Sequence, residues 1–196
     1  MPKLTEQPTI VIFARWPQPG KVKTRLASVY GDEGAARIYR RLLEYTLAAA
    51  LESGLLVELR VTGASCETFE EAFGPGLVIR DQGFGDLGAR LARVTPPALV
   101  IGSDLPALSA LLLRQAAEAL ANHEVVIGPA GDGGYWLIGL RQTWPWLFND
   151  MAWSTPQVLP ETLARLEARE ITPALLPELA DIDQPEDLAG WPEFAP

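Results

Sequence analysis

Short apolar segments alternate with longer amphipathic segments along most of this chain. The apolar or β-branched segments cover residues 9–14, 55–63, 77–81, 98–104, 124–130 and 134–140. Helical patterns cover residues 32–52, 66–74, 87–94, 109–123 and 155–170. Strands that alternate with helices, and that are apolar on both faces, are typical of a parallel sheet with helices packed on either side. We therefore predict an α/β fold with a mostly parallel sheet and helices on both faces.

The same segments show no sign of a second folding unit. The chain has 196 residues, of which 48% are hydrophobic, and this is enough for one sizeable core. No Ser- or Gly-rich linker and no internal repeat divides it. We expect a single domain over residues 1–196, with the last residues, 190–196, loosely attached. Asp32 is expected to open the first long helix, Gly54 to stop it, and Ser109 to cap a later one.

Composition excludes several classes of function. There are 25 acidic residues against 16 basic ones, a formal net charge of −9, and nucleic-acid binding requires a basic face. Cys66 and His123 are the only residues of their kinds, so a disulfide within the chain and a Cys/His zinc site are both excluded. Any bound metal would be held by carboxylates, which favours Mg²⁺ or Mn²⁺. The single cysteine and the lack of a secretory signal or membrane-spanning segment predict a cytoplasmic protein.

Ligands of such sheets bind beyond the carboxyl ends of the strands, so the segments that follow each strand are the candidate site. The first, "RWPQPGKVKTRL", contains Gly20, Lys21, Lys23 and Arg25. In an extended loop these three cations would project to the same side, and an anion such as a di- or triphosphate would relieve their repulsion. Gly20 would let the backbone approach that phosphate. The alternative is a solvated basic turn.

The fourth strand is followed by "GSDLPAL". Asp104 at the tip of this strand is a candidate ligand for a metal that bridges phosphates, and Ser103 beside it is a candidate nucleotide contact. The alternative for Asp104 is an N-cap of the next helix.

Two further segments carry acidic residues. In "AGDGGYW", Asp132 is a candidate general base that faces the acceptor, and the alternative is a hairpin turn. In "DIDQPEDL", Asp183 is a candidate second metal ligand or a helix cap, and Asp181 is left without a role. Trp153 and Ser154 lie in a loop that could cover the acceptor.

The segment "GFGDLG" at residues 83–88 matches the dinucleotide-binding pattern G-x-G-x-x-G, with Asp104 downstream to meet a ribose. An NAD-type dinucleotide-binding protein is therefore a rival prediction. Two features argue against it: the segment follows the third strand rather than the first, and its helix is short before Pro96. The other interpretation has Gly83, Gly85 and Gly88 lining a nucleotide.

Taken together, the motifs resemble a bacterial family described as nucleotide-diphospho-sugar transferases, some of them linked to arsenosugar biosynthesis. The resemblance rests on six segments in order: "FARWPQPGKVKTRL", "DQGFGDLGARL", "IGSDLPAL", "GPAGDGGYWLIGL", "AWST" and "DIDQPEDL". It implies a Rossmann-like glycosyltransferase-A fold, with Lys21, Lys23 and Arg25 on the donor phosphates and Asp104 on the metal. The wider superfamily also includes nucleotidyltransferases.

One departure from that family bears on the reaction. Glycosyltransferases of this fold usually carry Asp-x-Asp at the end of the fourth strand, where this chain has Gly102-Ser103-Asp104. Nucleotidyltransferases of the fold often pair one such acid with a late one, which suits Asp104 with Asp183.

We thus expect a transferase that needs Mg²⁺ or Mn²⁺ and that moves a glycosyl group from a nucleotide-activated donor to a small acceptor. Lys23 and Arg25 would neutralise the leaving group, and Asp132 would act as base. Nucleotidyl transfer with release of pyrophosphate is the alternative. The sequence predicts neither the base, the sugar, the acceptor nor the oligomeric state.

Overall fold

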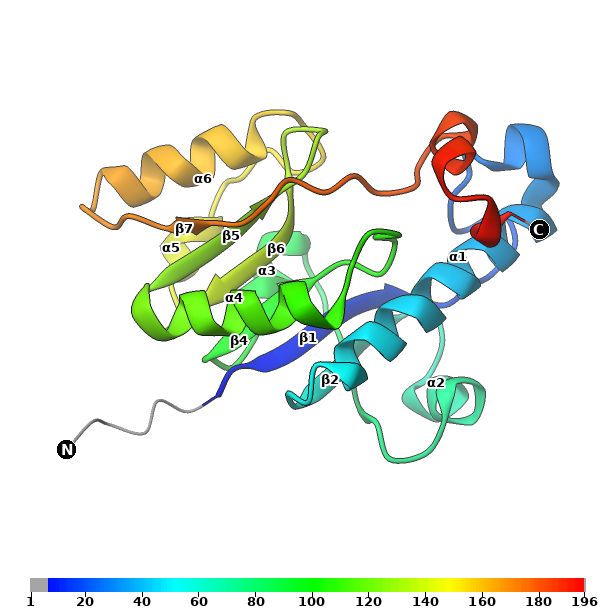
Figure 1. Cartoon of the computed structure of the whole chain (residues 1–196), viewed down its shortest axis with the longest axis horizontal. Helices are drawn as coiled ribbons and strands as arrows, with labels where there is room; N and C mark the ends of the chain where they lie inside the picture. The colour runs from blue at the N-terminus through cyan, green and yellow to red at the C-terminus, as the bar shows by residue number, and fades with distance from the viewer. Residues whose placement is uncertain (1–6, 196) are drawn as a thin grey trace.

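The computed structural model describes residues 7–195, and its centre is a seven-stranded sheet with the order β3-β2-β1-β4-β6-β5-β7 (Figure 1). The strands are β1 (Thr9–Arg15), β2 (Val57–Thr62), β3 (Val78–Asp81), β4 (Ala98–Ile101), β5 (Val125–Pro129), β6 (Tyr135–Leu140) and β7 (Ala174–Leu175). Neighbouring strands are parallel except at β6, which is antiparallel to both β4 and β5. The predicted mostly parallel sheet is confirmed.

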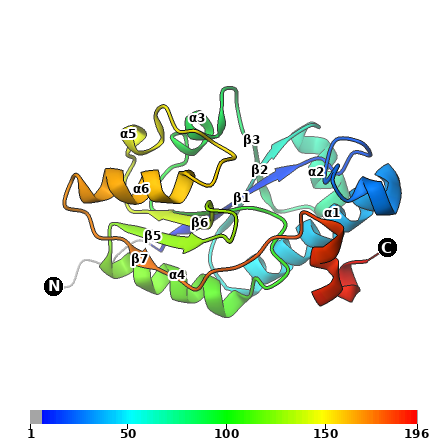
Figure 2. The same cartoon turned by 90° about the horizontal axis from the view of Figure 1, so that it is seen from above.

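Helices cover the sheet on both faces, as predicted (Figure 2). The α-helices are α1 (Ala27–Glu52), α2 (Cys66–Phe73), α3 (Leu87–Leu91), α4 (Ala110–Asn122), α5 (Pro145–Phe148) and α6 (Val158–Glu167). Two 3₁₀ turns follow, η1 (Pro185–Gly190) and η2 (Pro192–Phe194). Figure 2 shows α1 and α4 on one side of the sheet and α3, α5 and α6 on the other. Among residues 7–195, no helix combines the length and hydrophobicity needed to cross a membrane.

Strand β1 shows how the sequence produces these layers. Successive side chains of a strand point to opposite faces. Ile10 and Ile12 pack in the core under α1 and α4, whereas Val11 between them packs in the core under α3, α5 and α6. All three are at most 2% exposed. A strand in the middle of a sheet with helices on both faces is apolar on both faces, and β1 is apolar from Ile10 to Ala14.

The expected helix signals are found where the sequence placed them. The long helix proper begins after Gly31, whose backbone (φ 66°, ψ 169°) is not helical, so Asp32 opens it as predicted. Gly54, at φ 78°, follows its end. Ser109 caps α4 by accepting a hydrogen bond from the Leu112 N–H at 3.2 Å.

One expectation is wrong, and one helix was missed. Of the segment 190–196, which was expected to be loose, the structure describes residues 190–195, and Phe194 among them is only 5% exposed and packs with Ile38 and Leu42 of α1. Its ring also meets that of Tyr45 edge-on at 5.4 Å. A tail that carries a large aromatic side chain gains stability by burying it against an apolar helix face. The short helix α5 was not predicted, since four residues are too few to show a periodic pattern.

Candidate functional site

The segments that follow β1, β4 and β5 converge at one edge of the sheet with the chain around residues 180–184. The Ile182 N–H donates to the Asp104 carbonyl at 3.2 Å, so the late acidic segment is tied to the end of β4. The Leu159 N–H donates to the Gly133 carbonyl at 2.9 Å, so the first turn of α6 is tied to the β5–β6 hairpin. Segments that are far apart in the sequence therefore meet at this edge and bring the predicted site residues to it.

A cluster of opposite charges forms where the first and last of these segments meet. The Lys23 ammonium lies 2.8 Å from Oδ2 of Asp104 and 3.6 Å from Oδ1 of Asp183. Arg25 also forms an ion pair with Asp183. The Lys23 side chain is 8% exposed and that of Arg25 is 65% exposed. The structure thus joins two of the predicted phosphate-binding cations directly to both predicted metal ligands, in what we call the Lys23 cluster (Lys23, Arg25, Asp104 and Asp183).

The electrostatics of this cluster include a further acid, Asp181. Burial alone would lower the pKa of Lys23, but the charges of Asp104, Asp181 and Asp183 more than offset this, and its pKa is raised. The pKa of Asp181 is raised by its own burial and then by repulsion from Asp104. Lys23 is therefore firmly protonated, whereas the charge on Asp181 is only partly compensated.

The basic loop differs from the extended segment that was expected. It is a series of turns, and Lys23 itself has a left-handed backbone with φ 46°. The three cations therefore do not project to one side: Lys21 is exposed and forms no ion pair with any residue in the range 7–195. Gly20, at φ 71°, allows the turn that begins this loop.

Neither acid of the cluster serves as a helix cap. Ser109 caps α4, which leaves Asp104 free for another role. The 3₁₀ turn η1 is capped through Gln184 and Asp187, whose carboxylate accepts from the Asp183 N–H at 2.9 Å. The side chains of Asp104 and Asp183 both face Lys23 instead.

The donor set of the Lys23 cluster suits a hard divalent cation. Carboxylate oxygens are the ligands that Mg²⁺ and Mn²⁺ prefer, and here a cation, the ammonium of Lys23, already lies within reach of both acids. Within residues 7–195, however, no three His, Cys, Asp or Glu side chains are grouped as a metal site. Asp104 and Asp183 are thus fitted to hold a metal only if Lys23 moves away from them.

A cavity of about 240 Å³ lies beside the cluster. The residues that line it include Asp104, Asp132, Tyr135, Trp153 and Asp181. Asp132 is exposed, and its Oδ1 accepts a hydrogen bond from the Gly134 N–H at 2.9 Å. Asp132 therefore lies at the hairpin turn between β5 and β6, as one interpretation predicted, and it also lines the cavity, where it remains a candidate general base.

The two tryptophans near the cavity differ in role. Trp136 is 4% exposed and donates through Nε1 to the Pro177 carbonyl at 3.0 Å, as expected of a core residue. Trp153 lines the cavity, and its buried Nε1 has no hydrogen-bond partner among the described residues. Ser154 next to it has a left-handed backbone, φ 62°, a conformation that is costly for a residue other than glycine.

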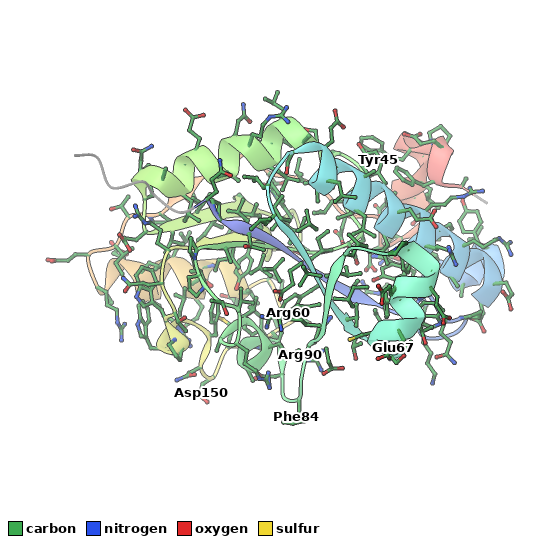
Figure 3. The ribbon with its side chains drawn as sticks, turned by 90° about the horizontal axis from the view of Figure 1, so that it is seen from below. Tyr45, Arg60, Glu67, Phe84, Arg90 and Asp150 are labelled. Carbon is green, nitrogen blue, oxygen red and sulfur yellow. The ribbon has the colours of Figure 1, made fainter. Side chains whose placement is uncertain are left out.

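The glycine-rich segment between β3 and α3 gives little support to dinucleotide binding. Gly83 and Gly85 have φ of 76° and 92°, and the loop projects from the molecule with Phe84 at its tip, 88% exposed (Figure 3). A Cβ on Gly88 would lie 2.6 Å from the Phe148 carbonyl, so that glycine is packed against protein. The following helix, α3, has only five residues.

Two residues that position the site were missed by the sequence reasoning. The Tyr39 hydroxyl accepts from the Arg15 N–H at 2.9 Å and lies 2.8 Å from Oγ of Ser103. Ser103 is therefore buried, at 4% exposure, and joins the ends of β1 and β4. The Gln82 amide donates to the Ala14 carbonyl at 2.9 Å and so holds the ends of β1 and β3 together. A tyrosine within a helical pattern or a glutamine after a strand gives no signal of such contacts.

A family described as "Uncharacterized protein conserved in bacteria (DUF2064)" matches residues 46–155. No curated protein matched the sequence. Among solved structures, a Desulfovibrio desulfuricans G20 protein with a provisional description as a nucleotide-diphospho-sugar transferase superposes with a TM-score of 0.85 at 29% identity, over 90% of this chain and 82% of the other.

More distant structures share the fold. The inositol-1-phosphate CTP transferase of T. maritima has a TM-score of 0.57 at 13% identity, over 93% of this chain and 91% of its own. Rv0371c of Mycobacterium tuberculosis H37Rv, solved in complex with manganese, has a TM-score of 0.56 at 17% identity, over 95% and 98% of the two chains. These likenesses confirm the predicted nucleotide-diphospho-sugar transferase fold.

Proposed function

The chain belongs to the DUF2064 family of bacterial proteins, and from the geometry of its site we propose that it is a metal-dependent glycosyltransferase that uses a nucleotide sugar. The observation that carries the proposal is the Lys23 cluster, where two cations and two carboxylates meet at the carboxyl edge of the sheet, beside a cavity. The provisional description of the Desulfovibrio protein supports the same class of donor.

Lys23 and Arg25 bind the donor's phosphates in this proposal. In the absence of nucleotide they are paired with Asp104 and Asp183, and a diphosphate offers both cations a stronger, doubly charged partner. Gly20, Gly83 and Gly85 belong to the two loops that flank the nucleotide in this proposal, whereas Gly88 lies in α3 and packs against Phe148. Ser103 holds the loop after β4 in place through its contact with Tyr39.

Asp104 and Asp183 are the residues that would hold a Mg²⁺ or Mn²⁺ ion. When bound, such an ion supplies positive charge to the leaving diphosphate. Lys23 and Arg25 add charge at the same place, so that the oxygen that leaves the anomeric carbon is stabilised as an anion. The acceptor hydroxyl forms the new bond to that carbon and gives up its proton to a carboxylate at the cavity, which we assign to Asp132.

Nucleotidyl transfer is the second candidate, and one observation favours it. The end of β4 offers a single acid, Asp104, paired across the site with a late one, Asp183, as in nucleotidyltransferases that this chain resembles. The distant likeness to a CTP transferase is compatible with that reaction.

The proposal also includes a single domain over residues 1–196. It places the protein in the reducing cytoplasm, which the single cysteine favours.

The test is a thermal-shift panel followed by product analysis. Nucleotide sugars, nucleoside triphosphates and NAD are each added with and without Mn²⁺, because a ligand that binds the native state raises the midpoint. We expect a metal-dependent shift with a nucleotide sugar, and release of a nucleoside diphosphate or monophosphate without pyrophosphate. Pyrophosphate release from a triphosphate would establish the second candidate. A metal-independent shift with NAD alone would contradict both.

A further inference from the structure

The cavity beside the Lys23 cluster carries charge of only one sign. Three carboxylates line it, from Asp104, Asp132 and Asp181. Among the described residues that line it, none is a lysine or an arginine. Lys23 is paired with Asp104, with its ammonium 2.8 Å from Oδ2 of that acid, and its side chain is 8% exposed. Arg25 is paired with Asp183, which is not part of the lining.

An anionic acceptor would find no partner in such a cavity. Asp104 is paired with Lys23, but a phosphate or carboxylate group brought next to Asp132 and Asp181 is repelled. A charged group that leaves water without meeting an opposite charge also loses several kcal/mol of solvation free energy, as an order of magnitude. Sites that recognise phosphate place Arg, Lys or backbone N–H groups around it. In the proposed function, Lys23 and Arg25 bind the phosphates of the nucleotide on the donor side of the site.

The polar atoms that face the cavity instead require a group that both donates and accepts hydrogen bonds. Ionised carboxylates only accept, so Asp132 and Asp181 need donors. The hydroxyl group of Ser154, which also lines the cavity, both donates and accepts. Hydroxyl groups meet both requirements.

The size of the cavity limits the acceptor further. At about 240 Å³ it lies below the range of roughly 300–1,000 Å³ found for clefts that hold drug-sized ligands. The side chains of Tyr135 and Trp153 give it apolar surface between the acids. A molecule with a compact carbon skeleton and several hydroxyl groups fits this combination.

We propose that the acceptor is a small polyhydroxylated molecule that carries no phosphate or carboxylate group. This rests on the transferase function proposed above and narrows it. The reacting atom of such an acceptor is a hydroxyl oxygen rather than a phosphate oxygen. The proposal therefore favours glycosyl transfer over transfer of a nucleotidyl group to a phosphorylated sugar. The new bond joins that oxygen to the anomeric carbon, the nucleoside diphosphate leaves with the bonding electron pair, and the hydroxyl proton goes to a carboxylate.

The experiment offers the enzyme matched pairs of acceptors with the donor found by the thermal-shift panel. Each pair is an uncharged compound and its anionic derivative: glucose and glucose 6-phosphate, glycerol and glycerol 3-phosphate, inositol and inositol 1-phosphate, ribose and ribose 5-phosphate. We expect transfer to uncharged members, detected by mass spectrometry, with kcat/KM at least 10-fold above that of the anionic partner.

The outcomes separate this inference from the proposed function. Donor binding and hydrolysis combined with equal or better transfer to the anionic members would overturn the inference and leave the function standing. Donor hydrolysis without transfer to any uncharged member would also count against it. Failure to bind any nucleotide sugar would overturn the function itself.

A pair of variants tests the cause of the selectivity. Asp132→Asn keeps an oxygen that accepts from the Gly134 N–H, so the hairpin turn is preserved while the charge is lost. We expect its ratio of uncharged to anionic kcat/KM to fall at least threefold, whatever happens to the absolute rate. Asp150→Asn is the matched control: Asp150 is exposed, does not line the cavity, and lies at the edge of the molecule in Figure 3. An equal ratio in both variants would contradict an electrostatic origin.

Discussion

The two halves of the site are built from different kinds of residues. The half that we propose for the donor combines Lys23 and Arg25 with Asp104 and Asp183: the Lys23 ammonium lies 2.8 Å from Asp104 and 3.6 Å from Asp183, and Arg25 pairs with Asp183. The half that we propose for the acceptor, around Asp132, Asp181 and Trp153, has acids without lysine or arginine among the described lining residues. Asp104 is common to both halves.

This difference indicates what each half is prepared for. In the proposed function, the paired cluster exchanges its internal partners for phosphate and metal. The carboxylates of the other half accept hydrogen bonds from the acceptor's hydroxyl groups. Under this proposal, positive charge is concentrated where the donor's phosphates bind, and the place of bond formation has no lysine or arginine among its described lining residues.

The largest effect is expected from a substitution of Asp104, the residue that the two halves share. Asp104→Asn removes one of two metal ligands and the principal partner of Lys23. We expect the metal-dependent gain in nucleotide affinity to be lost and turnover to fall by at least about 100-fold, the scale seen when one charge-stabilising group is removed from an active site. Calorimetry measures the nucleotide affinity with and without metal, and steady-state kinetics measure the turnover rate. Asp150→Asn should leave both unchanged, and a similar loss in that control would contradict the assignment.

Replacing Lys23 should change the affinities for nucleoside diphosphate and for free Mn²⁺ in opposite directions. Lys23→Met should weaken nucleoside diphosphate binding by about 10- to 100-fold, since a hydrogen bond to a charged group contributes about 1.5–3 kcal/mol. It should strengthen binding of free Mn²⁺, because Asp104 and Asp183 lose the ammonium that lies between them.

Manganese titration followed by electron paramagnetic resonance measures the second effect. Lys21→Met is the control, as Lys21 is exposed and without an ion pair in the described part of the chain. If Lys23→Met bound free Mn²⁺ more weakly than the wild type, the competition between lysine and metal would be wrong.

A substitution at Gly133 should perturb the acceptor half of the site and leave the donor half unaffected. The φ of this glycine is 87°, and a Cβ there would lie 2.5 Å from the Pro156 carbonyl. Gly133→Ala must therefore shift the loop that carries Trp153, and we expect acceptor-dependent turnover to fall by about 10-fold, the cost of roughly 1.4 kcal/mol, with nucleotide affinity unchanged. Gly131→Ala, where the new Cβ would meet only Glu178 Oε1 at 3.4 Å, should be nearly neutral. Equal loss of nucleotide affinity and turnover would show that the halves are not separable.

The smallest effect concerns stability without ligand. The pKa of Asp181 is raised by burial and by repulsion from Asp104, so its charge destabilises the native state near neutral pH, and this cost disappears as the pH falls through the raised pKa. Asp181→Asn should therefore raise the melting temperature at pH 7 by up to about 2–4 °C, the shift that 1 kcal/mol gives a chain of this size, and by less at lower pH. A lower melting temperature at pH 7 would contradict this sign.

The sequence predicted the fold well because its signals are local. The apolar run in β1, the Ser109 cap and the Gly54 stop each depend on neighbouring residues, and all are confirmed. The buried tail residue Phe194 was missed because its partners on α1 lie more than 140 positions earlier in the chain.

The site was predicted less completely. That Lys23, Arg25, Asp104 and Asp183 share one region followed from their positions at strand ends. Their direct pairing did not, because the left-handed backbone of Lys23 has no signature in a lysine. The bonds from Tyr39 to the ends of β1 and β4 join positions 24 and 64 residues apart, and a single sequence gives no indication of them.

The most direct measurement is a calorimetric titration of the wild-type protein with the nucleoside diphosphate of its donor, once with Mn²⁺ and once with EDTA. If phosphate and metal share the Lys23 cluster, affinity should be at least 10-fold higher with Mn²⁺, and this gain should vanish in Asp104→Asn. Equal affinity with Mn²⁺ and with EDTA, or no binding in either, would contradict a metal-assisted nucleotide site at these residues.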